Sequence, residues 1–436
     1  MLYALIGVAF LIPQKVIGER NYGTYILAQS LLTVIYMLSD GFALQAMVNF
    51  GMDESRRAQA LTISALTHLV FIGSTTAAIY FGRDIVAGMF SKPELAHTLE
   101  LFPLVALGFL LRNYFLKVSQ LHIDTRSTFL IDLVWVLGTV GLLVAGWQSG
   151  RLSTAEDMMV VSAISSALSS LAGLVLYGTR LRLTLKLDGA YTGRMLGFGT
   201  AQLASAATIA AQSQGDLLLL GRFASTAVVG NYDTAKKIFR AFEAIRDAGS
   251  LFVYPAVARL SSEGREKEMV FLVEKMIGFT FFVITPIVVC VWLGPTDRIF
   301  ELIYHGKYRE APMIFKVMSL AALAIPFSLN MNVLAGLGEA RKFFRVTATA
   351  AIGFFIAGLI LIPAFGGIGA ALTLVASYVL LGALSTHAVR QRIDFSLRSS
   401  FGRWRDAAEF GARTWQRVIG RKNARAERRS SRRHRR

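Results

Sequence analysis

Residues 230–256 form an apolar stretch with a cluster of six charged side chains between positions 236 and 247. At about 100° per residue of an α-helix, four of the six fall within about 60° of one another, and the other two flank them. The four are Lys236, Arg240, Glu243 and Asp247, and the flanking pair is Lys237 and Arg246. Cations outnumber carboxylates on this face, so the chemistry that it favours is binding of an anion. We assign no catalytic residue in the chain.

The composition places this charged face inside a membrane. Hydrophobic residues make up 54% of the 436-residue chain and charged residues 17%, and the mean hydropathy is +0.51. A soluble domain does not expose so much apolar surface, so the sequence predicts an all-α polytopic membrane protein. Each central charge in a membrane helix costs roughly 2.5–3.5 kcal/mol unless it lines water or is paired. Two interpretations stay open: a water-filled, net-positive cavity, or i,i+4 pairs that only lock helices together.

Apolar runs separated by polar breaks predict about twelve transmembrane helices, because about 20 helical residues cross a bilayer. The predicted spans are 1–17, 23–49, 61–82, 97–118, 128–147, 157–177, 196–220, 230–256, 268–293, 312–337, 343–363 and 367–389. The breaks leave no room for a soluble catalytic domain. We expect two six-helix bundles, 1–178 and 196–389, joined by a cytoplasmic linker at 179–195. The first span is at the short limit for crossing, so we expect the complete protein to start upstream of Met1.

Basic residues in alternate loops set the predicted orientation, because they stay on the cytoplasmic side. Fifteen lysines and arginines fall in the even-numbered loops and eight in the odd-numbered ones, which places both termini in the cytoplasm. The basic tail, residues 390–436, has aromatic and small residues at helical spacing as far as Val418. We expect an amphipathic helix on the anionic inner leaflet, followed by disorder over 421–436. The membrane surface explains this charge, so we predict no nucleic-acid partner.

Two short motifs match between the halves of the chain. Gly23-Thr-Tyr25 is followed fifteen residues later by Asp40. Gly230-Asn-Tyr232 is followed at the same interval by Asp247. The match predicts a duplicated six-plus-six architecture around a central cavity. It also places a mostly uncharged polar face on span 23–49, opposite the ionic face. We expect this polar face to bind the substrate by hydrogen bonds. This polar face comprises Gln29, Ser30, Thr33, Tyr36, Ser39 and Asp40.

Other polar groups in the predicted spans are weaker candidates for the cavity. Lys15 lies near the end of the first span and either lines the cavity or extends to the interface, as do Lys275 and Lys316. Asp216 is better placed to pair with a cavity cation or to bind a coupling ion. The six histidines are scattered, and Cys290 is the single cysteine. We therefore predict no metal site and no cofactor.

Several segments of the chain match a known pattern. They are Ile17-Gly-Glu-Arg-Asn-Tyr-Gly-Thr-Tyr25 with Asp40-Gly-Phe42, Asp216-Leu-Leu-Leu-Leu-Gly-Arg222, Val229-Gly-Asn-Tyr232, Pro255-Ala-Val-Ala-Arg-Leu260, Tyr304-His-Gly-Lys-Tyr308, Gly336-Leu-Gly338 and Pro363-Ala-Phe-Gly-Gly-Ile-Gly-Ala370. In these motifs the chain resembles the polysaccharide flippases of the multidrug, oligosaccharidyl-lipid and polysaccharide exporter superfamily, over almost its whole length. In that family span one is usually longer, which weakens the portal role of Lys15.

The resemblance implies two pseudo-symmetric six-helix bundles, alternating access and a cationic central cavity. It implies that an undecaprenyl-diphosphate oligosaccharide is flipped across a bacterial inner membrane for O-antigen, capsule or exopolysaccharide synthesis, with polysaccharide polymerase machinery as a partner. The anion-binding residues that it implies are Lys236, Lys237, Arg240 and Arg246. We expect Gln29, Thr33, Tyr36 and Lys15 to complete the substrate site, and Asp40, Asp216, Glu243 and Asp247 to act in gating or coupling.

Three rival functions stay open. A drug and cation antiporter of the same superfamily should have an acidic cavity, which the surplus of lysine and arginine disfavours. A flippase for lipid II, the peptidoglycan precursor, typically has fourteen spans. A membrane polysaccharide polymerase or ligase should show a large extracytoplasmic loop, and the spacing of the predicted spans contains none.

Overall fold

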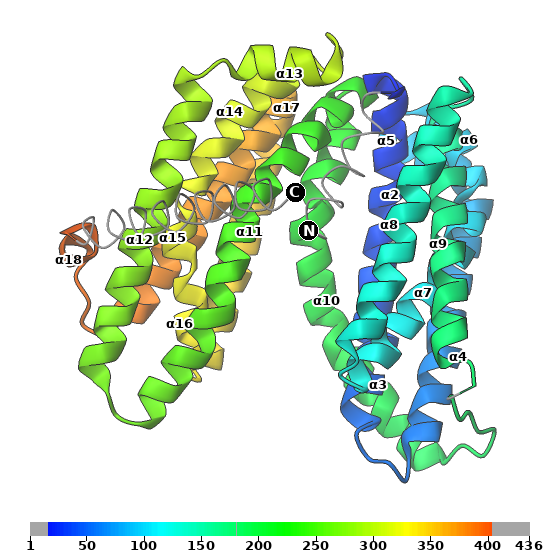
Figure 1. Ribbon diagram of the computed structural model, residues 1–436, viewed down its shortest axis with the longest axis horizontal. Helices are drawn as coiled ribbons and strands as arrows, with labels where there is room; N and C mark the ends of the chain where they lie inside the picture. The colour runs from blue at the N-terminus through cyan, green and yellow to red at the C-terminus, as the bar shows by residue number, and fades with distance from the viewer. Residues whose placement is uncertain (1–15, 180, 403–436) are drawn as a thin grey trace, which may run out of the picture. The chain divides into compact units, whose positions relative to one another are not determined.

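The computed structural model describes residues 16–179 and 181–402, which form an all-helical chain (Figure 1). The predicted first span at 1–17 and Lys15 therefore fall almost wholly outside the described residues, and so does the predicted amphipathic helix of the tail. The described chain divides into two compact units.

Unit 1 combines Met1–Ile238, Thr296–Phe315 and Phe354–Leu374. Its elements are α2 (Glu19–Ser39), the π-helical turn η1 (Asp40–Leu44), α3 (Gln45–Phe50), α4 (Arg57–Phe81), α5 (Arg83–Phe90), α6 (Pro93–Glu100), α7 (Phe102–Leu121), α8 (Thr125–Gln148), α9 (Ala155–Tyr177), α10 (Gly189–Phe223), the start of α11 (Thr226–Ser262), α13 (Thr296–Tyr304), the start of α14 (Ala311–Ala322) and the middle of α17 (Ala340–Arg390). Helices α7 and α8 pack against α9, and α10 packs against α2 and η1.

Side-chain caps explain where three of these helices begin. Thr154 and Asp157 form a reciprocal capping box at the start of α9. Asp124 accepts a hydrogen bond from the backbone N–H of Ser127 at 3.0 Å, and Asp188 accepts one from Ala190 at 2.9 Å. These carboxylates satisfy backbone donors that the first turn of a helix leaves unpaired.

Small residues allow close packing between α7, α8 and α9. A Cβ added to Gly108 would lie 2.3 Å from the Ser166 hydroxyl oxygen. Ser170 donates a hydrogen bond to the carbonyl of Gly108 at 2.7 Å, and Ser169 donates one to Ile131 at 2.7 Å. Small side chains and interhelical hydrogen bonds are the usual means of helix association in a bilayer, where apolar burial gives no driving force.

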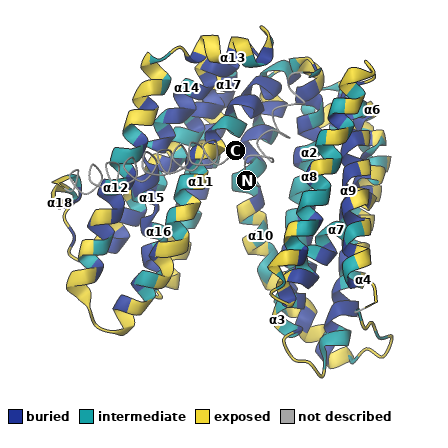
Figure 2. Cartoon of the chain, in the orientation of Figure 1, coloured by how far each residue is buried: buried dark blue, intermediate teal, exposed yellow. Residues whose placement is uncertain are grey.

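Unit 2 combines Phe239–Pro295, Lys316–Gly353 and Val375–Arg436. Its buried core includes Val257, Val273 and Val389. Figure 2 shows the buried residues of the described helices in dark blue. The unit consists of the rest of α11, α12 (Glu266–Leu293), the end of α14, α15 (Ile325–Ser328), α16 (Asn330–Gly336), both ends of α17 and α18 (Leu397–Gly402).

Seven of the described helices are long and apolar enough to cross a membrane, or eight if α14 and the following α15–α16 segment, bent by 46°, form one span. The prediction of an all-α polytopic membrane protein is thus confirmed. The helix α17 breaks at Gly366 (φ 54°, ψ −126°), between the predicted spans 343–363 and 367–389. The total of twelve spans and the two-bundle boundaries stay predictions.

Candidate functional site

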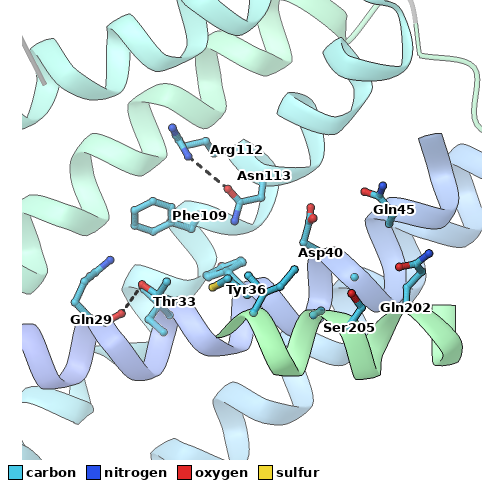
Figure 3. Close-up of a pocket in the computed structure, with 15 residues that line it drawn as sticks. Gln29, Thr33, Tyr36, Asp40, Gln45, Phe109, Arg112, Asn113, Gln202 and Ser205 are labelled. Atoms are coloured by element: carbon cyan, nitrogen blue, oxygen red, sulfur yellow. Dashed lines mark hydrogen bonds between the residues drawn. The ribbon is translucent and has the colours of Figure 1, made fainter. Parts of the chain in front are cut away.

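Unit 1 contains a cavity of about 540 Å³, a volume typical of small-molecule sites (Figure 3). Helices α2, α3, α7 and α10 and the turn η1 supply its walls. Four of the predicted site residues line it: Gln29, Thr33, Tyr36 and Asp40. The other polar lining residues are Gln45, Arg112, Asn113, Gln202 and Ser205. The hydrogen-bonding face expected on span 23–49 therefore borders an actual cavity.

The cavity lies beside a π-helical turn, a rare element that is frequent at functional sites. Asp40 opens this turn, and its Oδ2 lies 3.1 Å from the Lys117 Nζ. Lys117 also donates to Gln45 Oε1 at 3.1 Å. Asp40 is the only carboxylate among the described lining residues. Its charge is compensated by Lys117, so it leaves the cavity without a net negative charge.

Arg112 is a cavity residue that the sequence interpretation placed wrongly. The fifteen basic residues counted above in the even-numbered loops include Arg112 and Lys117, whereas both lie inside α7. The Arg112 side chain is 12% exposed, and its Nη2 lies 2.5 Å from Asp132 Oδ1. Its guanidinium covers the Trp135 ring at 4.9 Å from the centroid. A charged residue inside the apolar run 97–118 was the signal that pointed to this position.

Several lining groups keep hydrogen-bonding capacity. Gln29 Oε1 is buried and accepts no hydrogen bond from any described residue, and Arg112 Nε donates none. Within the described part of the chain, the side chains of Gln202 and Ser205 also make no hydrogen bond. By contrast, the Tyr36 hydroxyl donates to the carbonyl of Ala106. The cavity thus offers free donors and acceptors beside aromatic and apolar surface.

Lys236 and Asp216 form a buried ion pair between α10 and α11. Lys236 Nζ lies 2.6 and 2.8 Å from the two carboxylate oxygens and 3.0 Å from the carbonyl oxygen of Ser213. Tyr232 donates to Asp216 at 2.6 Å, and the carboxylate is 1% exposed. An ammonium has three N–H groups, and all three are used here. Lys236 therefore has none left for a phosphate in this arrangement.

Lys237 is held in a second ion pair. Its Nζ lies 3.1 Å from Asp233 Oδ2 and 4.8 Å from the centroid of the Tyr22 ring. Tyr22 donates to the same carboxylate at 2.6 Å. The pair connects the start of α11 to the start of α2, because Tyr22 belongs to α2.

The matched glycines of the two motifs contact each other where α2 and α11 cross. A Cβ at Gly23 would lie 1.7 Å from the carbonyl oxygen of Thr226, and a Cβ at Gly230 would lie 2.3 Å from that of Glu19. In each case the carbonyl belongs to the residue four positions before the partner glycine. The contact between the two motifs is therefore reciprocal.

The remaining charged residues of α11 belong to unit 2. Arg246 donates to the Tyr378 hydroxyl at 2.8 Å, and Tyr378 donates to Glu243 Oε1 at 2.7 Å. Arg246 also pairs with Asp247 at 3.1 Å. Arg240 is exposed and makes no hydrogen bond or ion pair with any residue in the described ranges. The structure thus separates the predicted ionic face into paired residues and one free cation within the described chain.

Comparison with known proteins decides the family. Residues 15–312 match the model of the family described as "Polysaccharide biosynthesis protein". The chain belongs to this family.

Two curated archaeal proteins are similar to this member of the polysaccharide biosynthesis family. A probable low-salt glycan biosynthesis flippase of Haloferax volcanii is 21% identical over 92% of this chain and 82% of its own length. An uncharacterized membrane protein of Methanocaldococcus jannaschii is 28% identical over 130 residues, which cover 30% of this chain and 25% of that protein.

Solved structures show the fold of this polysaccharide biosynthesis protein. The lipid II flippase MurJ in an inward closed conformation has a TM-score of 0.72 at 12% identity, over 91% of this chain and 87% of MurJ. An inward-facing multidrug resistance MATE transporter of the MOP superfamily has a TM-score of 0.71 at 14% identity, over 90% and 94% of the two chains. The fold is thus of the MATE and MurJ type, that of a multi-pass membrane protein.

Proposed function

We propose that this protein flips an undecaprenyl-diphosphate-linked oligosaccharide from the cytoplasmic to the outer leaflet of a bacterial cytoplasmic membrane by alternating access. The observation that carries the proposal is the cavity beside η1, whose free hydrogen-bonding groups belong to membrane helices. The probable glycan flippase of Haloferax volcanii supports the same substrate class. The product is O-antigen, capsule or exopolysaccharide, and its polymerase machinery is the expected partner.

The lining suits a sugar better than an organic cation. Sugar hydroxyls both donate and accept, which matches the free acceptor of Gln29 and the free donor of Arg112. The rings of Tyr36 and Phe109 offer apolar surface to the C–H face of a sugar ring. A drug and cation antiporter needs an uncompensated carboxylate in its cavity, and Asp40 is paired with Lys117.

The diphosphate requires cations, and Arg240 is the residue that we assign to it. A guanidinium forms two parallel hydrogen bonds with phosphate oxygens. Arg246 is a second candidate, already held by Tyr378 and Asp247. Around these residues we propose twelve spans in two pseudo-symmetric bundles, with both termini cytoplasmic and the basic tail on the anionic inner leaflet.

The test is a flipping assay with the purified full chain in proteoliposomes. A fluorescent undecaprenyl-diphosphate oligosaccharide is incorporated, and an impermeant reductant bleaches the label that reaches the outside. Parallel liposomes carry fluorescent lipid II or take up an organic cation dye. Faster bleaching of the oligosaccharide lipid than in empty liposomes supports the proposal. Dye uptake without lipid flipping would instead assign an antiporter.

Gln29→Leu separates sugar binding from folding. Leucine removes a buried acceptor that has no partner within the described chain and keeps most of the side-chain volume. We expect the melting temperature to stay equal or to rise, because an unsatisfied polar group is removed. We expect the flipping rate to fall about threefold to tenfold, which corresponds to one lost hydrogen bond to a sugar.

The matched control for Gln29→Leu is Gln391→Leu, at an exposed glutamine outside the cavity. It should leave both the flipping rate and the melting temperature unchanged. An unchanged flipping rate in Gln29→Leu would remove this glutamine from the sugar site. A large fall in melting temperature would show that its role is structural.

A further inference from the structure

The most unusual ionic group in the described chain is the ammonium of Lys236, which three oxygens surround. These oxygens are both carboxylate oxygens of Asp216 and the carbonyl oxygen of Ser213, at 2.6–3.0 Å from the nitrogen. Two donors fix the carboxylate in place: the Tyr232 hydroxyl at 2.6 Å and the backbone N–H of Leu217 at 2.8 Å. The oxygens are thus preorganised around a single positive charge.

Hard monovalent and divalent cations prefer this kind of ligand set, in which carboxylate and carbonyl oxygens converge on one point. The carboxylate is 1% exposed, so it requires a permanent counter-charge. A lysine ammonium supplies one charge and three N–H donors, and it stays attached to the chain. It therefore meets the electrostatic demand that an alkali metal ion would otherwise meet.

We propose that the Asp216 oxygen cluster is a monovalent-cation site that the chain fills permanently with its own Lys236 ammonium. It follows that unit 1 needs no bound sodium or potassium ion at this position. The inference concerns an ion and not the lipid cargo, so it stands or falls independently of the flipping activity proposed above.

The Lys275 side chain provides a matched control on another membrane helix. It is exposed on α12 and lies over the Phe271 ring, with 5.7 Å between its Nζ and the ring centroid. The structure records no ion pair between Lys275 and a described carboxylate. Its truncation removes the same atoms as truncation of Lys236 but vacates no oxygen cluster.

The experiment measures thermal unfolding of the full chain in detergent, in sodium, potassium or N-methylglucamine chloride at equal ionic strength. We expect the wild-type melting temperature to be the same in all three salts. Lys236→Ala vacates the cluster. The melting temperature of this variant should therefore be about 2 °C or more higher in sodium or potassium chloride than in N-methylglucamine chloride. Lys275→Ala should show no difference between the salts, and neither should the double variant Lys236→Ala, Asp216→Ala.

Lys236→Gln is measured beside Lys236→Ala, because it removes the charge while keeping more of the packing. Radioactive sodium binding to the same preparations gives a second readout, with saturable binding expected in the Lys236 variants only. A variant that folds in sodium or potassium chloride but not in N-methylglucamine chloride also supports the proposal. Equal behaviour of both Lys236 variants in all salts, folded or unfolded, without sodium binding, would overturn it.

Discussion

Gly23→Ala and Gly230→Ala are each expected to destabilise the folded protein strongly and to abolish flipping. At Gly23 the added methyl carbon would lie 1.7 Å from the carbonyl oxygen of Thr226, which is less than any real contact. Because the obstructing atom is backbone, no rotamer change relieves the clash, and α2 and α11 must separate. We expect a loss of about 3 kcal/mol in folding free energy, the upper range for overpacking.

The same substitution at Gly73 is the control for this crossing. Gly73 lies within α4, and a Cβ there would meet no atom within 4 Å. Gly73→Ala should therefore keep or slightly raise the melting temperature, because alanine is the better helix former. If Gly23→Ala unfolds at the same temperature as Gly73→Ala, the crossing of α2 and α11 at this point is refuted.

Arg240→Ala is expected to lower the rate of flipping about tenfold to a hundredfold without lowering the melting temperature. Hydrogen bonds to a charged group contribute about 1.5–3 kcal/mol, and loss of that amount at a diphosphate gives this change in rate. Folding should not suffer, because Arg240 is exposed and has no partner among the described residues. Arg240→Lys should retain part of the activity, since it keeps the charge and loses the planar fork.

Arg398→Ala is the control for Arg240. This arginine is also exposed, and it lies in α18, outside the membrane helices that carry the ionic residues. We expect wild-type flipping in this variant. Equal rates for Arg240→Ala and Arg398→Ala would exclude Arg240 from the headgroup site, and the assignment would then pass to Arg246.

The two matched motifs show how far sequence reasoning reached in this protein. Matching Gly23-Thr-Tyr25 to Gly230-Asn-Tyr232 predicted which residues are equivalent, because equivalence depends on spacing alone. It did not predict that the two glycines contact each other, since a repeat axis can pass through any pair of helices. The crossing follows from packing, which the order of residues along one helix does not reveal.

The candidate site was predicted in composition but not in its pairing. Helical periodicity placed Lys236 and Lys237 on one polar face of α11, and both do belong to that helix. Their partners depend on how α10 and α2 approach, so the sequence left open whether Asp216 binds a lysine or an ion. Arg112 was missed as a cavity residue because the face of α7 that borders the cavity depends on residues of α2 and α10, which the order of residues along α7 does not reveal.

The ion pairs of unit 1 have a consequence for the response to membrane potential. A single charge that crosses 100 mV exchanges about 2.3 kcal/mol with the field. A cation that moves together with its carboxylate exchanges none, because the pair is electrically neutral. Movements that keep such pairs together are therefore electrically silent at the paired residues, so voltage dependence of turnover would report the charge of the cargo and of cations such as Arg240 that are unpaired within the described chain. Four of these pairs are Asp40 with Lys117, Asp132 with Arg112, Asp216 with Lys236 and Asp233 with Lys237.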